Sequence, residues 1–193
     1  GIAAAIGQCS VFTVGDPRQA IMGFRGGSPQ SWGGPWEGYA LTQTFRFGPN
    51  IAALANEIAG RFGGAPIVGA DVPDVVGWLP SIDMALAIGG GDRVILARSN
   101  LECECIVRAF PGLKHVRRDP LDPFSTDADR FRDCAMDGLV PVSTVHGAKG
   151  REWDHVILAM DLDRKENDPE WERVKYVAVT RAKKRITLTG EIE

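Results

Sequence analysis

Short continuous runs of apolar residues alternate along the chain with longer stretches in which apolar residues recur at helical spacing. The continuous runs predict buried strands at residues 10–14, 93–97, 139–145, 155–160 and 185–189. The helical spacing predicts helices at residues 48–63, at 100–110 and from 169 through 178, and an acidic surface helix with loops within 119–139. Buried strands that alternate with helices favour an α/β fold with a mainly parallel sheet flanked by helices.

Two unusual turns directly follow predicted strands. They are Gly15–Gln19, after the first strand, and Thr144–Gly150, after the third. In parallel sheets, ligands bind beyond the carboxyl ends of the strands. We therefore expect a phosphate or polynucleotide site at these turns.

Composition narrows the class of protein. The chain has 193 residues, of which 44% are hydrophobic and 24% charged, as in a soluble globular protein with one large or two small domains. No apolar run approaches the roughly 20 residues that a membrane-spanning helix needs, so we expect no membrane association. The four cysteines lack metal-ligand spacing and are expected to be buried free thiols of a cytoplasmic protein. The net charge of −3 gives no global basic field, but it does not exclude a small DNA-binding face.

The segment from Gly15 to Gly27 presents a polar turn followed by an aromatic residue and a cation. Gln19 can orient a water molecule or hydrogen-bond a terminal phosphate, and Phe24 can stack on a base beside Arg25. The alternative is a structural corner with Phe24 in the core.

Arg46 lies just before a predicted helix, between two aromatic residues, in the sequence T-F-R-F-G-P-N. Its planar guanidinium could clamp a phosphate, although a surface salt bridge is an equal alternative. Arg181, in Y-V-A-V-T-R-A-K-K, could act as an arginine finger that neutralises charge on a transferring phosphoryl group.

A third segment, S-T-V-H-G-A-K-G-R-E-W-D, places Thr144, His146 and Lys149 in a glycine-bearing turn at a strand end. Hydroxyl groups, backbone N–H groups and lysine commonly contact phosphate oxygens. Glu152 could accept a hydrogen bond from a ribose hydroxyl. The spacing is not that of a Walker A loop, and a lone histidine such as His146 is more often structural than catalytic.

The order of these motifs resembles that of the UvrD/Rep family of superfamily-1 DNA helicases. The resemblance implies a RecA-like (P-loop NTPase-like) fold, and ATP bound between two such domains whose closing and opening moves the protein along single-stranded DNA, usually 3′→5′. By the same resemblance Gln19 and Arg46 would approach the γ-phosphate, Arg181 would be the arginine finger, and Glu152 would contact the ribose.

The resemblance also implies a DNA-binding set. Phe24 and Arg25 would lie along single-stranded DNA, Thr144 and His146 would face its backbone, and Lys149 would support that turn. The expected partners are single-stranded or partly duplex DNA and a first, N-terminal RecA-like domain. Met22 stands where the family usually has a tyrosine that stacks on a base.

The sequence contains neither a Walker A Lys-Thr/Ser pair nor an Asp-Glu metal-binding pair. We therefore expect residues 1–28 to be the tail of the first RecA-like domain and 29–193 to be the second, C-terminal one. ATP and Mg²⁺ would both require the missing N-terminal domain, so the chain alone would be inactive. The alternative hypotheses are a non-catalytic, helicase-derived DNA- or protein-binding module and, with less support, a small phosphotransferase.

Overall fold

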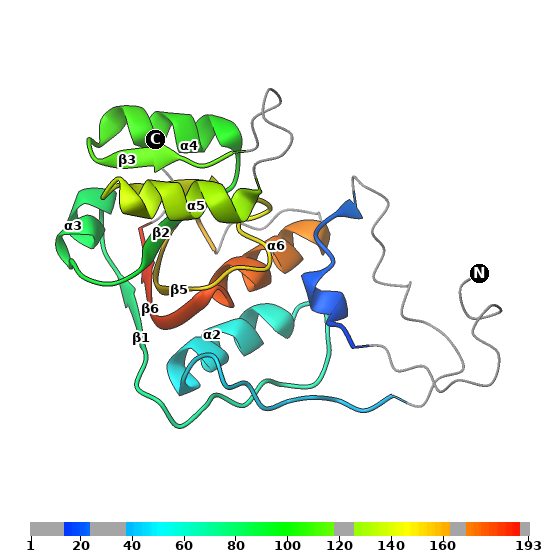
Figure 1. The fold of residues 1–193 in the computed structure, drawn as a ribbon. Coiled ribbons are helices and arrows are strands. Elements are labelled where there is room, and N and C mark those ends of the chain that lie inside the picture. The colour runs from blue at the N-terminus through cyan, green and yellow to red at the C-terminus, as the bar shows by residue number, and fades with distance from the viewer. Residues whose placement is uncertain (1–13, 24–37, 118–125, 163–168, 190–193) are drawn as a thin grey trace.

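The computed structural model describes residues 14–23, 38–117, 126–162 and 169–189 (Figure 1). Its centre is a sheet whose strands follow the order β1-β6-β5-β2-β4-β3, and every pairing is parallel. The strands are β1 (Val75–Trp78), β2 (Arg93–Ala97), β3 (Leu113–His115), β4 (Val140–Thr144), β5 (Trp153–Ala159) and β6 (Ala182–Leu188). The predicted α/β fold with a parallel sheet is confirmed.

Helices cover both faces of the sheet. They are the short 3-10 helix η1 (Pro17–Gln19) and the α-helices α2 (Pro49–Ala59), α3 (Ile82–Ala87), α4 (Asn100–Ala109), α5 (Asp127–Met136) and α6 (Pro169–Val179). Alternate residues of each central strand face opposite sides, as the two-residue period of a strand requires. Val156 and Leu158 pack against α2, α5 and α6, whereas Ile157 and Ala159 pack against α3 and α4.

Three elements were not predicted, and each lacks a strong apolar pattern. β1 and β3 are short strands at the two edges of the sheet, where fewer residues are buried, and β1 contains Gly77. α3 has only six residues, too few for a helical period to repeat. The predicted strand at 10–14 lies outside the described residues except for Val14.

Other expectations are met in part. Cys103 and Cys105 lie on α4 and face different directions, Cys103 buried and Cys105 exposed, so the expectation of burial is wrong for Cys105. Within the described ranges, no helix is long and apolar enough to cross a bilayer.

Candidate functional site

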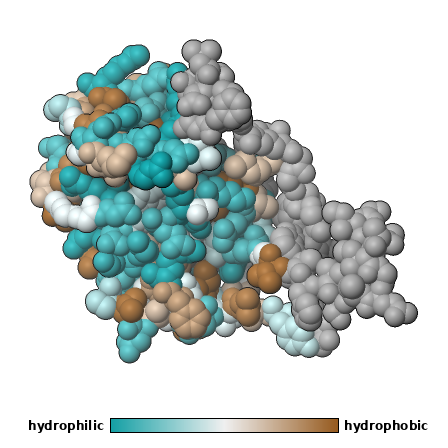
Figure 2. Space-filling view, viewed as in Figure 1, coloured by the Kyte–Doolittle hydropathy of each residue, from teal (hydrophilic) through white to brown (hydrophobic). Residues whose placement is uncertain are grey.

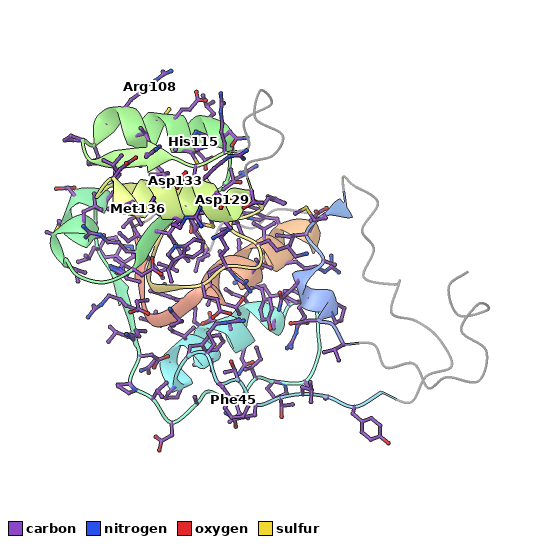
Figure 3. All side chains as sticks on the ribbon, in the orientation of Figure 1. Phe45, Arg108, His115, Asp129, Asp133 and Met136 are labelled. Carbon is purple, nitrogen blue, oxygen red and sulfur yellow. The ribbon has the colours of Figure 1, made fainter. Side chains whose placement is uncertain are left out.

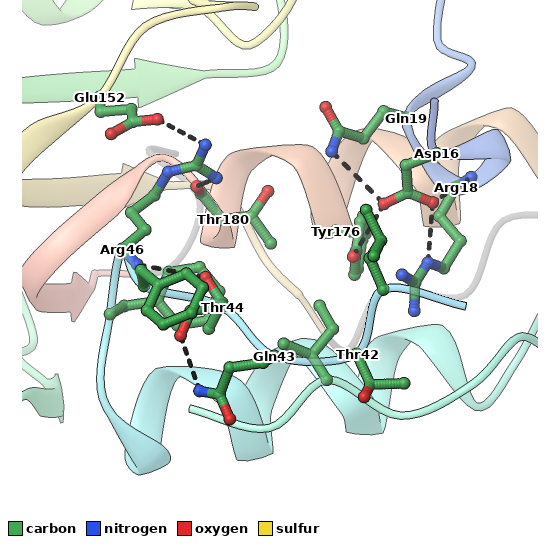
Figure 4. Close-up of a pocket in the computed structure, with 14 residues that line it drawn as sticks. Asp16, Arg18, Gln19, Thr42, Gln43, Thr44, Arg46, Glu152, Tyr176 and Thr180 are labelled. Atoms are coloured by element: carbon green, nitrogen blue, oxygen red, sulfur yellow. Dashed lines mark hydrogen bonds and ion pairs between the residues drawn. The ribbon is translucent and has the colours of Figure 1, made fainter. Parts of the chain in front are cut away.

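A pocket of about 460 Å³ opens beside α6 and the segment that precedes α2 (Figure 4). The residues that line it are 41–47, Asp16, Arg18, Gln19, Ile67, Glu152, Tyr176 and Thr180. Three residues singled out from the sequence, Gln19, Arg46 and Glu152, line it together although they are far apart along the chain. A pocket of this size is large enough for a nucleotide-sized ligand.

Arg46 stands on a backbone segment that is held along its length by a neighbouring segment. The Thr44 N–H donates to the Val68 carbonyl at 2.9 Å, and the Ala70 N–H donates to the Phe47 carbonyl at 2.9 Å. The side-chain Nε2 of Gln43 donates to the carbonyls of Val68 and Gly69. The segment therefore has little freedom, and Arg46 projects from a fixed place.

The start of α2 fixes the other end of this segment. Its N-cap residue, Gly48, has no side chain to cap the helix, and Asp74 caps it from a distant part of the chain. The Asp74 carboxylate accepts from the backbone N–H groups of Asn50, at 3.1 Å, and Ile51, at 2.7 Å. A Cβ at Gly48 would lie 2.2 Å from the Val72 carbonyl oxygen, so this crossing requires glycine.

The Arg46 guanidinium is engaged at two of its three nitrogens. Nη1 donates to the Thr180 carbonyl at 3.1 Å, and Nη2 forms an ion pair with Glu152 Oε1. Nε is buried and has no hydrogen-bond partner among the described residues. Arg46 thus keeps an unsatisfied donor inside the pocket wall, which is unusual for a buried polar group.

Arg181 is close to Arg46 but does not line the pocket. It is 2% exposed, and its Nε donates to the Val177 carbonyl at 3.0 Å while Nη1 donates to the Arg151 carbonyl at 3.3 Å. Burial, and then the charge of Arg46, lowers the pKa of Arg181 to about 10, so it remains charged at neutral pH. In this arrangement its guanidinium is held by the chain's own carbonyls.

At the other end of the pocket, Asp16 organises the turn that carries Gln19. The Asp16 carboxylate accepts from Tyr176 Oη at 3.1 Å, from Arg18 Nε at 2.9 Å and from Gln19 Nε2 at 3.4 Å. A carboxylate only accepts hydrogen bonds, so the amide of Gln19 must turn its nitrogen to Asp16, and Figure 4 shows its oxygen on the far side. Burial, and then Asp16, raises the pKa of Tyr176, which stays protonated and able to donate.

The turn after β4 is closed by local hydrogen bonds. The Gly147 N–H donates to Thr144 Oγ1 at 3.1 Å, and the Ala148 N–H donates to the Thr144 carbonyl at 3.0 Å. A Cβ at Gly147 would lie 2.8 Å from Ser143 Oγ, so the close packing of this turn favours glycine at the position.

This turn contacts the turn that carries Gln19. Lys149 Nζ donates to the Gln19 carbonyl at 2.9 Å. His146 is half-buried, which lowers its pKa, and the backbone of Ile21 opposes that effect. The two turns predicted at strand ends therefore meet. Phe24 and Arg25 lie outside the described residues.

The expectation that the site lies beyond the carboxyl ends of the strands holds only for the turn after β4. Glu152 and Thr180 come directly before β5 and after α6, at the amino ends of β5 and β6. Residues 145–152 run back from the carboxyl end of β4 to the amino end of β5. This single connection therefore reaches both ends of the parallel strands.

Sequence reasoning passed over several residues of the site. Phe45 is 87% exposed at the pocket, and Figure 3 shows it on the segment beneath α2. Figure 2 shows further hydrophobic side chains along this lower edge. Phe45 and Tyr176 stand inside the motifs described above, close in sequence to Arg46 and Arg181, so that proximity was the available signal. Asp16 belongs to the polar turn that was singled out with Gln19, but no role was assigned to it. Asp74 belongs to no motif. The described residues contain no cluster of three potential metal ligands.

Residues 139–189 match the family described as the UvrD-like helicase C-terminal domain. The match includes Thr144, His146, Lys149, Glu152 and Arg181. It confirms the resemblance that the motifs indicated. No curated protein gives a significant match to the chain.

Two solved helicase structures are similar to this chain, and the first of them shares its fold. The C-terminal domain of a possible DNA helicase from Lactobacillus plantarum WCFS1 is 20% identical, with a TM-score of 0.50 over 77% of this chain and 88% of that chain. The Arterivirus nonstructural protein 10 (helicase) is 17% identical, with a TM-score of 0.42 over 77% of this chain and 24% of that chain. At 20% identity the first likeness bears on the fold alone, and it agrees with the RecA-like α/β architecture.

Proposed function

Because residues 139–189 match the UvrD-like helicase C-terminal domain family, we propose that the chain is the second, C-terminal motor domain of an ATP-dependent DNA helicase. Its task would be to close on ATP held by a first RecA-like domain and to open after hydrolysis, moving along single-stranded DNA 3′→5′. The domain division at residue 28 is part of this proposal.

The observation that carries the proposal is the convergence of Gln19, Arg46 and Glu152 on one pocket. A guanidinium binds phosphate oxygens through paired N–H groups, and a carboxylate accepts from ribose hydroxyls. The amide oxygen of Gln19, turned away from Asp16, is placed to accept from an attacking water. The three groups supply the contacts that a nucleoside triphosphate needs from a second domain.

The pocket also fits the nucleotide at two further points. The unpartnered Nε–H of Arg46 is the kind of buried donor that an anionic oxygen satisfies. The exposed ring of Phe45 offers a face on which a base can stack. Mg²⁺, when bound with ATP, would neutralise charge on the phosphates, and we assign its ligands to the first domain.

The DNA contacts are proposed at the turn after β4. The hydroxyl of Thr144 and the ring of His146 stand at the carboxyl end of that strand, and hydroxyl and imidazole groups can hydrogen-bond to phosphate oxygens. Lys149 joins this turn to the carbonyl of Gln19 and so links the DNA-facing and nucleotide-facing parts. Phe24 and Arg25, which follow Gln19 in the sequence, are proposed to continue the path of the strand.

One observation favours the second candidate, a non-catalytic DNA- or protein-binding module. Arg181 is buried and donates to backbone carbonyls, so it must leave these partners before it can serve as an arginine finger. A module that binds but does not hydrolyse would have no use for that movement.

ATP turnover of the longer protein that joins this chain to a phosphate-binding first domain decides between them. We expect Mg²⁺-dependent hydrolysis that single-stranded DNA stimulates, and a loss of at least a hundredfold in Arg46→Ala. The 193-residue chain alone is expected to show no turnover. Absence of turnover in the longer protein, or full activity in Arg46→Ala, would leave the binding module as the function.

A further inference from the structure

We propose that Glu152 masks Arg46 in the nucleotide-free chain, so that the ion pair between them competes with phosphate for the pocket and must exchange when a nucleotide binds. The inference rests on the proposed function and concerns how its nucleotide site is regulated. It assigns to Glu152 a role opposed to simple ligand binding, since the same carboxylate hinders entry of the phosphates.

Glu152 satisfies only part of the hydrogen-bonding capacity of the Arg46 guanidinium. One carboxylate oxygen, Oε1, pairs with Nη2, and the adjacent Nε–H has no acceptor among the described residues. An arginine binds carboxylate or phosphate best through two parallel hydrogen bonds. Glu152 therefore occupies Arg46 without satisfying it, which leaves a free-energy gain for an anion that supplies two oxygens.

The ion pair between Arg46 and Glu152 is partly exposed to solvent. The side chains of Arg46 and Glu152 are 30% and 38% exposed, so water and salt screen their attraction. Exposed pairs of this kind contribute little to stability. The pair is strong enough to be formed when the pocket holds no anion and weak enough for a multiply charged phosphate to displace it.

Arg46 is held by contacts that do not involve Glu152, so it should stay in place when the Glu152 side chain moves away. Its Nη1 is held by the Thr180 carbonyl, and its backbone is fixed by the segments at Val68 and at Asp74. Glu152 has no hydrogen-bond partner other than Arg46 among the described residues. The exchange is thus a movement of one glutamate side chain away from a fixed arginine.

The test uses the 193-residue chain and inorganic triphosphate, which carries the charge of the nucleotide but no ribose for Glu152 to contact. Affinity is measured by calorimetry at low salt, and the Nε–Hε signal of Arg46 is followed by NMR. The variants are Glu152→Gln, Arg46→Ala and the double variant. Glu104→Gln is the matched control, because Glu104, on α4, is 37% exposed and pairs with an arginine, Arg117, at 3.1 Å.

We expect Glu152→Gln to bind triphosphate roughly three- to tenfold more tightly than the unchanged chain, as release from a partly exposed ion pair predicts. Glu104→Gln should bind like the unchanged chain, because it makes the same change in net charge elsewhere. The double variant should lose the gain, and triphosphate should shift the Arg46 Nε–Hε signal. Thermal unfolding checks that each variant is folded.

Equal or weaker binding by Glu152→Gln overturns the proposal, as does a gain that persists in the double variant or appears in Glu104→Gln. These outcomes are independent of the test of function. A gain in Glu152→Gln without ATP turnover in the longer protein would sink the motor function and leave the masking intact. Turnover that depends on Arg46, without a gain in Glu152→Gln, would do the reverse.

Discussion

Two regions of the molecule place a pair of arginines around a third titratable group. At the pocket, Glu152 pairs with Arg46, and Arg181 is buried nearby without lining the pocket. In the sheet, Arg93 on β2 and Arg185 on β6 flank His155 on β5, because the strand registers align these three residues in one row. The intervening group is a carboxylate in the first case and an imidazole in the second.

The two regions relieve the repulsion between guanidiniums in different ways. Glu152 supplies a negative charge and remains partly exposed, so its pairing can change. His155 is buried beside Thr187 Oγ1, at 2.9 Å, and burial followed by the charges of Arg185 and Arg93 lowers its pKa to about 4. The imidazole is therefore neutral at pH 7. The partly exposed charges of the pocket cluster can therefore exchange partners, whereas the buried sheet cluster is fixed.

The rate of ATP hydrolysis should show the greatest difference between the pocket cluster and the sheet cluster. In the longer protein, Arg181→Ala should lower the rate of DNA-stimulated ATP hydrolysis by about a thousandfold or more, because an arginine finger contributes that much to kcat. Arg185→Ala, the equivalent change in the sheet cluster, should leave turnover unchanged.

Because Arg181 is buried, Arg181→Lys is measured beside it, which keeps the charge but not the planar fork. Steady-state kinetics with and without single-stranded DNA provide the readout. Equal losses in Arg181→Ala and Arg185→Ala would remove the functional distinction between the clusters.

The next effect is the pH dependence of stability at His155. Its pKa is about 4 in the folded chain, against 6.5 for an unhindered histidine, so the unfolded state binds the proton more tightly. Stability should thus be intact above about pH 6.5 and fall as the pH drops towards 4, by up to about 3 kcal/mol from this group.

Urea unfolding across this range should show a shallower fall in His155→Gln, which cannot be protonated. Arg185→Ala should also reduce the slope by removing one flanking charge. Identical pH profiles for the unchanged chain and His155→Gln would contradict the account of the sheet cluster.

A smaller effect is expected where the pocket depends on a remote residue. Asp74→Ala removes the cap of α2 and leaves the buried Ile51 N–H without an acceptor, which should lower the free energy of unfolding by about 2 kcal/mol. Asp71→Ala, at an exposed position nearby, is the control. An unchanged unfolding midpoint in Asp74→Ala would show that the segment carrying Arg46 is held by other contacts.

The smallest effect is expected at Tyr176, whose hydroxyl links α6 to the turn that carries Gln19. Tyr176→Phe removes the hydrogen bond to Asp16 and keeps the ring, so stability should fall by only about 1 kcal/mol. Because Arg18 and Gln19 still donate to Asp16, the turn should remain folded. Chemical denaturation measures the change, and a loss several times larger would mean that the link to α6 holds the whole turn.

The central strands and the longer helices were predictable because burial on both faces leaves continuous apolar runs, as in Val94–Ala97 and Val156–Ala159. Edge strands bury less and leave no such run, which is why β1 and β3 were missed. The candidate residues of the site could be chosen from the residue types that their motifs contain. The cap at Asp74 was not, because its partners are 23 and 24 residues away and no local pattern marks it.

The α/β class, the parallel sheet and the resemblance of the motifs to those of UvrD/Rep helicases could all be derived from the sequence, because they depend on periodicity and on residues close together in the chain. Only the tertiary structure decided which of those residues meet. It paired Arg46 with Glu152, turned Arg181 towards backbone carbonyls and placed His155 between two arginines. Each of these outcomes depends on distance, burial and register between segments far apart in the chain, and charge interactions are set by those quantities.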